Sequence, residues 1–223
     1  MSTESGYIHA LRFSFLNALY DPVVALTSRE QRFKTVLLNG VALASGQRVL
    51  DVGCGTGTLA CMAAQRAPGA QMVGLDGDAS ILDRARRKAT ERDISIEFVH
   101  GMSVELPFPD GHFDSVLSSL FFHHLDASAK QRTFAEIFRV LKPDGQLHIA
   151  DWGAAQDALM RAAFLIIQAV DGFATTGDNV RGKLPGMVVQ AGFHAVHIDR
   201  RLRTMLGTME IVRASKSALK KVG

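Results

Sequence analysis

A carboxylate and three glycines stand together in the stretch VLDVGCGTG, which covers residues 49–57. The missing side chains of Gly53, Gly55 and Gly57 would let backbone N–H groups approach a ligand closely. Asp76 ends the next predicted strand about twenty residues later, where a carboxylate commonly accepts hydrogen bonds from both hydroxyls of a ribose. The pattern therefore predicts a site for a nucleoside derivative.

Asp51 sharpens the choice of ligand, because it lies just before the first of these glycines. A carboxylate at this place would repel the pyrophosphate of a dinucleotide and attract a cation. S-adenosylmethionine (SAM) carries an adenosine, an ammonium and a sulfonium, and it has no phosphate. The spacing GxGxG also departs from the GxGxxG of dinucleotide sites. Two alternatives stay open: an NAD-dependent oxidoreductase, and a protein that binds SAM without catalysing a reaction.

The elements that must position these residues alternate along the chain. Strand-like segments are followed by helix-like segments of about 10 to 15 residues, a pattern typical of βαβ units in a parallel sheet. We expect a Rossmann-like, doubly wound α/β sheet, mostly parallel with an antiparallel C-terminal edge. The polar, glycine-rich stretch 171–186 is predicted to be a loop. The predicted strands are 47–52, 71–76, 94–101, 113–120, 146–151, 194–204 and 208–215, and the predicted helices that separate them are 57–67, 78–93, 127–141, 155–170 and 184–193.

Four stretches resemble the motifs of the class I SAM-dependent methyltransferases. They are VLDVGCGTG, VGLDGD over residues 73–78, GMSVELPFPDGHFDSVLSS over 101–119 and EIFRVLKPDGQLHIAD over 136–151. The resemblance implies methyl transfer from SAM to a small organic acceptor, with S-adenosylhomocysteine as the second product and no metal ion. It also implies cofactor contacts by Asp51, Gly53, Gly55, Thr56, Gly57, Asp76, Gly77, Met102, Ser103 and Ser118.

Met102 departs from the pattern of this family. An acidic residue often stands at this position and accepts a hydrogen bond from the adenine amino group. A methionine can only pack against the ring, so Ser103 or a backbone carbonyl is expected to accept that hydrogen bond instead.

The stretch SSLFFHHLD over residues 118–126 leaves a predicted strand at the ligand edge of the sheet. His124, and after it His123, are candidates to position the acceptor or to remove its proton, because imidazole titrates near neutral pH. Both histidines are also compatible with packing or helix-capping roles. A metal site is not expected, because no third ligand is evident. Further candidates for acceptor contacts are Phe121, Phe122, Asp151, Trp152 and Asn179, although Trp152 is equally compatible with a place over the core.

The N-terminal residues 1–43 are predicted to form helices. Their apolar residues recur at helical spacing, which usually indicates core packing. In many members of the resembling family an N-terminal helix covers the SAM site, and Tyr7 and Tyr20 would then meet the methionine end of SAM. We expect a single domain over residues 1–223, with 1–43 as a helical lid and 44–223 as the Rossmann-like core.

Composition limits the remaining possibilities. The formal net charge of +3 is too small to argue for a nucleic-acid partner. The two cysteines both lie in or just after the glycine loop, which disfavours a disulfide framework. No targeting signal or membrane-spanning segment is evident, so a cytoplasmic protein without stable membrane insertion is expected. The apolar lid and the Phe121–Phe122 pair favour an aromatic or lipid-like acceptor, in a manner reminiscent of quinone-biosynthesis methyltransferases. The sequence leaves the oligomeric state open.

Overall fold

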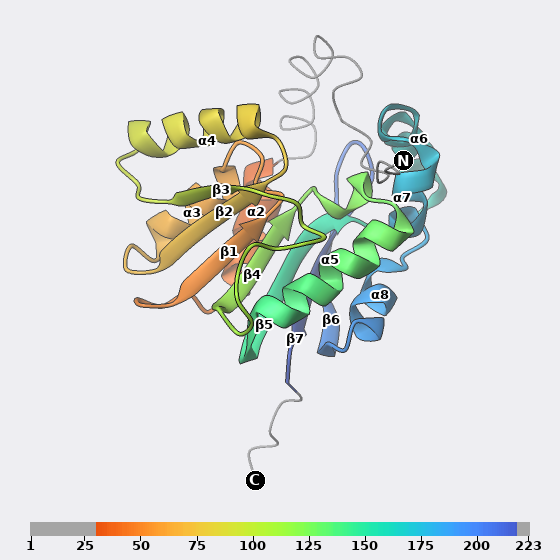
Figure 1. Cartoon of the computed structure of the whole chain (residues 1–223). Coiled ribbons are helices and arrows are strands. Elements are labelled where there is room, and N and C mark those ends of the chain that lie inside the picture. Colours follow the sequence, from red (N-terminus) through yellow and green to blue (C-terminus); the bar gives the residue numbers. More distant parts are fainter. Residues whose placement is uncertain (1–29, 218–223) are drawn as a thin grey trace, which may run out of the picture.

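The computed structural model describes residues 30–217. Its centre is a seven-stranded sheet in the order β3-β2-β1-β4-β5-β7-β6 (Figure 1). The strands β1 to β5 pair in parallel, and β7 pairs antiparallel with both β5 and β6. The strands are β1 Arg48–Val52, β2 Gln71–Asp76, β3 Glu97–His100, β4 Phe113–Ser119, β5 Leu141–Trp152, β6 His194–Arg203 and β7 Thr208–Ser215. The predicted doubly wound α/β sheet with an antiparallel C-terminal part is confirmed.

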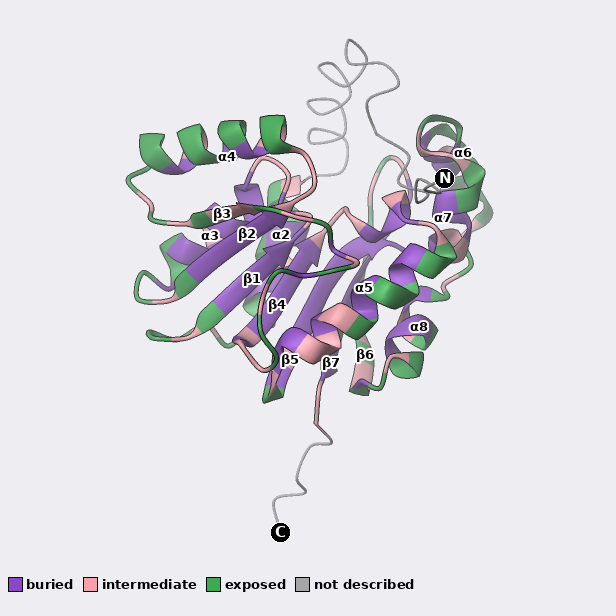
Figure 2. Cartoon of the chain, in the orientation of Figure 1, coloured by how far each residue is buried: buried purple, intermediate pink, exposed green. Residues whose placement is uncertain are grey.

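Helices cover both faces of this sheet. Figure 1 shows α5 and α8 in front of the sheet, with α2 and α3 on the far side. The apolar side chains on the two faces form two separate core clusters, and Figure 2 shows the central strands buried almost throughout. The helices are α2 Glu30–Asn39, α3 Thr58–Arg66, α4 Ala79–Glu91, α5 Ala127–Val140, α6 Ala158–Asp171, α7 Phe173–Val180 and α8 Leu184–Gln190, with a short 3₁₀ helix η2 at Phe122–His124.

Three helices begin at aspartates that follow the carboxyl edge of the sheet. The carboxylates of Asp78, Asp126 and Asp157 each accept a hydrogen bond from a backbone amide in the first turn of α4, α5 and α6. Such caps satisfy amides that have no partner within the helix, and each contributes about 0.5–2 kcal/mol. The predicted cap at Asp78 is confirmed, and the caps fix where the chain turns after each loop.

The stretch 171–186 is not the loop that its polar residues predicted. Residues 173–180 form α7, in which Thr175, Thr176 and Asn179 are buried. The hydroxyls of both threonines donate to carbonyl oxygens of the preceding turn at Asp171 and Gly172. Because these polar groups find partners inside the protein, a polar segment packs here as a helix.

The structure describes residues 30–43 of the predicted lid, and the helix within them packs into the core. Phe33, Leu37 and Leu38 of α2 are buried in the core cluster behind the sheet, so this part of 1–43 belongs to the core. Tyr7, Tyr20 and the rest of the predicted lid up to residue 29 lie outside the described residues. Within residues 30–217 no helix is long and apolar enough to cross a bilayer.

Candidate active site

The glycine loop after β1 has a backbone that side chains would not tolerate. Gly53, Gly55 and Gly57 have φ angles of 68°, 52° and 72°, in the left-handed region that favours glycine. A Cβ atom on Gly53 would also lie 2.2 Å from the ring of Phe121, which follows β4. The loop therefore turns sharply into α3 and brings bare backbone against an aromatic ring at the carboxyl edge.

The carboxylate of Asp76 faces this loop from the end of β2. One of its oxygens accepts a hydrogen bond from the Gly55 amide at 2.8 Å, and the other accepts from the Asp78 amide at 3.0 Å. Burial raises the pKa of Asp76, while these amides lower it. Each oxygen keeps a second lone pair, so the carboxylate can still accept hydrogen bonds from a ligand.

A small pocket opens between the glycine loop and the segments at the ends of β2, β3 and β4. Its apolar walls and its single carboxylate suit a nucleoside, whose base packs on side chains while its ribose hydroxyls donate. Met102 is 38% exposed here, and the Ser103 hydroxyl is hydrogen-bonded to that of Thr133 at 2.9 Å. The lining residues are Gly53, Leu75, Asp76, Gly77, Gly101, Met102, Ser103 and Phe121.

Asp51 is the least satisfied polar side chain near the pocket. The residue is 1% exposed, and within the described part of the chain neither carboxylate oxygen has a hydrogen-bond partner of normal geometry. Burial raises the pKa of Asp51 to about 7, against smaller lowering effects of Lys34 and the Ala60 amide. Since a buried carboxylate is costly without a partner, this site favours a cationic ligand.

Asp151, at the end of β5, organises the segment after β4. Its carboxylate accepts hydrogen bonds from the amides of Phe121 and Phe122 and from the Nδ1 atom of His123 at 2.8 Å. Burial works against a charged imidazole, but the carboxylates of Asp151 and Asp171 raise the pKa of His123 above its usual value. These contacts fix the turn at η2 and hold the buried side chain of His123 in place.

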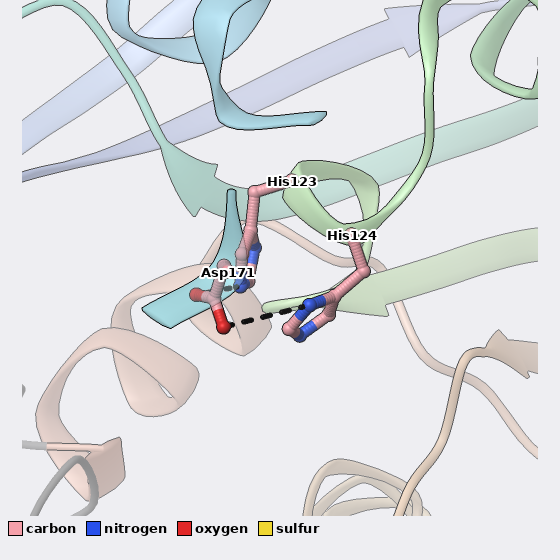
Figure 3. Close-up of side chains that lie close together, drawn as sticks. All are labelled: His123, His124 and Asp171. Atoms are coloured by element: carbon pink, nitrogen blue, oxygen red, sulfur yellow. Dashed lines mark ion pairs between the residues drawn. The ribbon is translucent and has the colours of Figure 1, made fainter. Parts of the chain in front are cut away.

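The second histidine and Asp171 complete this cluster (Figure 3). An Asp171 oxygen lies 3.7 Å from Nε2 of His123, and the other oxygen lies 4.0 Å from Nδ1 of His124. The side chain of His124 is 38% exposed, and partial burial together with His123 lowers its pKa. The sequence did not place Asp171 beside the histidines, because α5, β5 and the rest of α6 lie between them along the chain.

Comparisons with known proteins fit this arrangement. Residues 49–145 match a family model described as a methyltransferase domain. A demethylmenaquinone methyltransferase of Thermus thermophilus is 40% identical over 106 residues, which are 48% of this chain and 47% of that protein. A ubiquinone/menaquinone biosynthesis C-methyltransferase of Pseudomonas putida is 32% identical over 183 residues, which are 73% of this chain and 70% of that protein. The chain belongs to the class I SAM-dependent methyltransferases.

Solved structures of other proteins share the fold of this chain. The YcgJ protein of Bacillus subtilis superposes with a TM-score of 0.66 at 18% identity, over 84% of this chain and 99% of that chain. At that identity the likeness concerns the fold alone. The chain spans about half the length of the Thermus relative that it matches.

Two polar side chains expected at the cofactor of this methyltransferase domain are engaged elsewhere. The Ser118 hydroxyl is fully buried and donates to the Val52 carbonyl at 2.9 Å, which ties β4 to β1. The Thr56 hydroxyl accepts a hydrogen bond from the Lys88 ammonium at 2.7 Å. The Ser118 hydroxyl therefore belongs to the scaffold of the site and the Thr56 hydroxyl supports its glycine loop, while cofactor contacts by the backbone of these residues stay a prediction.

The residues expected to contact the acceptor lie in different surroundings, one at the pocket and the others inside the protein. Phe121 lines the small pocket beside Asp76. Phe122 and Trp152 are 0% and 1% exposed in the two core clusters, and the Asn179 amide donates to the Trp152 carbonyl at 3.1 Å inside the protein. These three side chains and Asp151 therefore support the site from beneath, and His124 is the exposed member of the group.

Proposed function

We propose that the protein transfers a methyl group from SAM to a small aromatic or lipid-like acceptor. The observation that carries this proposal is the buried carboxylate of Asp51 without a hydrogen-bond partner among the described residues, next to the pocket of Asp76. SAM offers a cation to Asp51 and ribose hydroxyls to Asp76. NAD offers the hydroxyls, but its pyrophosphate would meet a negative charge.

The chain's own residues have positioning roles in this reaction. SAM supplies an activated methyl group on its sulfonium, so the protein must mainly hold two reactants in line and exclude water. Asp76 and the glycine loop would hold the ribose, while Met102 and Phe121 pack against the nucleoside. His124 is the candidate to contact the acceptor, because it is partly exposed at the end of β4.

The proposed acceptor class takes its support from the relatives. The names of the Thermus and Pseudomonas proteins refer to methylation in menaquinone or ubiquinone biosynthesis. Such substrates are aromatic rings with lipid tails, which agrees with an aromatic or lipid-like acceptor. A demethylated quinol with a short tail is therefore the first acceptor to offer.

The test is turnover with methyl-labelled SAM. The protein should bind SAM, show no comparable affinity for NADH, and release S-adenosylhomocysteine when a demethylated quinol is supplied. Tight NADH binding without SAM binding would favour an oxidoreductase. SAM binding without turnover on a broad panel of small acceptors would favour a non-catalytic SAM-binding protein.

Asp76→Ala should weaken SAM binding by about 10- to 100-fold, because a charge-assisted contact to the ribose contributes about 1.5–3 kcal/mol. Calorimetric titration of SAM measures the change. Asp83→Ala, on the exposed side of α4, is the matched control and should leave the affinity unchanged. If folded Asp76→Ala protein binds SAM as the wild type does, the ribose is held elsewhere.

His124→Ala should keep SAM affinity within a few-fold and lower turnover. For an acceptor hydroxyl the loss should reach roughly 10²–10⁴-fold, whereas for a carbon acceptor that already carries negative charge it should be small. Turnover and SAM titration on the same preparation separate the two effects. An equal loss of SAM binding and of rate would instead place His124 in the cofactor site.

A further inference from the structure

We propose that His123, His124 and Asp171 form a binding site for one divalent transition-metal ion of the Zn²⁺ type. One ligand atom from each residue lies within 4.8 Å of the other two. Figure 3 shows the Asp171 carboxylate beside the two rings. One of its oxygens lies 3.7 Å from Nε2 of His123, and the other lies 4.0 Å from Nδ1 of His124. The third ligand that the sequence did not reveal is thus supplied by the end of α6.

The three donor atoms are already gathered on one side of the cluster, although they are farther apart than in a loaded site. With metal–ligand bonds of about 2.0–2.2 Å, the donors around a tetrahedral Zn²⁺ lie roughly 3.4 Å apart. One oxygen of Asp171 and one nitrogen of each ring, which lie within 4.8 Å of one another, would therefore draw together by up to about 1.4 Å on binding. The partly exposed His124 is the side chain best able to turn, while His123 is buried and held in place.

The surroundings of His123 orient it as a ligand. Its Nδ1 atom lies 2.8 Å from the Asp151 carboxylate, which can only accept, so Nδ1 carries the proton. The lone pair of neutral His123 is then on Nε2, which faces Asp171. A histidine that donates to a carboxylate through one nitrogen and faces a cation with the other is the usual arrangement at metal centres.

The charges around the cluster also favour a cation. Asp151 and Asp171 bring two buried carboxylates, with side chains 1% and 7% exposed. Lys130 lies close enough to Asp151 for the carboxylate to raise its pKa, although burial lowers it more, and its ammonium donates to the Thr175 carbonyl. Both carboxylates would stabilise a cation bound between the two rings.

The donor set selects the kind of metal. Two imidazole nitrogens and one carboxylate suit Zn²⁺, Co²⁺ or Fe²⁺, whereas Mg²⁺ and Ca²⁺ take oxygen ligands. Three protein ligands leave a coordination position for water or for an oxygen of an acceptor. A bound water does not depend on the proposed methyltransferase function, whereas a bound acceptor oxygen rests on it.

The test uses the full chain without a histidine tag, stripped with a chelator and titrated with Zn²⁺ and then Co²⁺ in the absence of SAM. One equivalent should bind with a dissociation constant of about 1 μM or below. His124→Ala and Asp171→Asn should each weaken binding by at least roughly tenfold. His197→Ala, on the exposed edge strand β6, is the matched control and should bind as the wild type does.

Three results would overturn the metal site. One is binding weaker than about 100 μM by the folded wild-type chain. Another is wild-type affinity in both His124→Ala and Asp171→Asn. The third is a cobalt–thiolate absorption band that assigns the ion to Cys54 or Cys61. Since no step uses SAM or an acceptor, failure of the methyltransferase proposal would leave this readout intact.

Discussion

Asp51→Asn is expected to make the fold more stable at neutral pH and to weaken SAM binding. Burial raises the pKa of Asp51 to about 7, whereas the unfolded chain has the ordinary value of 3.8. Between these two values the native state holds a proton that the unfolded state has released, so this group's contribution to stability falls as the pH rises. A neutral amide removes that cost, on the order of 2–4 kcal/mol at pH 8. The same change removes the partner of the SAM cation and should cost about 10- to 100-fold in affinity.

Chemical denaturation at several pH values checks the first half, and calorimetric titration of SAM at pH 8 checks the second. The gain in the free energy of unfolding should shrink as the pH falls from 8 toward 4. Asp76→Asn is the control, because the Asp76 oxygens already accept from the Gly55 and Asp78 amides. It should lose SAM affinity with a smaller gain in stability, because these amides offset part of the effect of burial on the pKa of Asp76. A less stable Asp51→Asn protein with unchanged SAM affinity would contradict the account.

Asp151→Ala is expected to destabilise the fold by about 3–5 kcal/mol, the largest loss anticipated for a single side chain in the site. The residue is 1% exposed and its carboxylate accepts from the amides of Phe121, Phe122 and Trp152 as well as from His123. Removal leaves these buried donors without an acceptor, and the raised pKa of His123 loses its main cause.

Urea denaturation monitored by circular dichroism measures this loss. Asp151→Asn should fall between the wild type and the alanine variant, since its carbonyl oxygen can still accept while its charge is gone. Asp144→Ala is the control, because Asp144 is exposed in the first part of β5 and should change stability by less than about 0.5 kcal/mol. An Asp151→Ala protein as stable as this control would mean that water satisfies the amides.

The sheet and its glycine loop could be predicted from the sequence because their signals are local. All of these signals lie within residues 48–76. They are two apolar runs of strand length, a glycine loop after the first run and an aspartate at the end of the second. The helix α7 could not be predicted in the same way. Its threonines and Asn179 look like loop residues until the structure shows the partners that allow their burial.

The site was predictable where it follows strand ends and not where it depends on distant contacts. Asp51 is the penultimate residue of β1, Asp76 ends β2, and the histidines follow β4. Phe121 and Phe122 are neighbours of one residue type, yet one lines the pocket and the other fills the core. The turn that separates their directions is set by Asp151, which is remote in sequence.

The position of β7 has a consequence for how the protein is made. A ribosome delivers β6 before β7, although β6 reaches the sheet only through β7, which lies between it and β5. Until residue 215 has emerged, β5 is an open edge and β6 has no sheet to join. Unpaired edges of this kind are prone to associate with other chains. Stalled or truncated translation products that lack β7 should therefore aggregate or bind chaperones. This holds even though the glycine loop and β1 to β5 have already been synthesised.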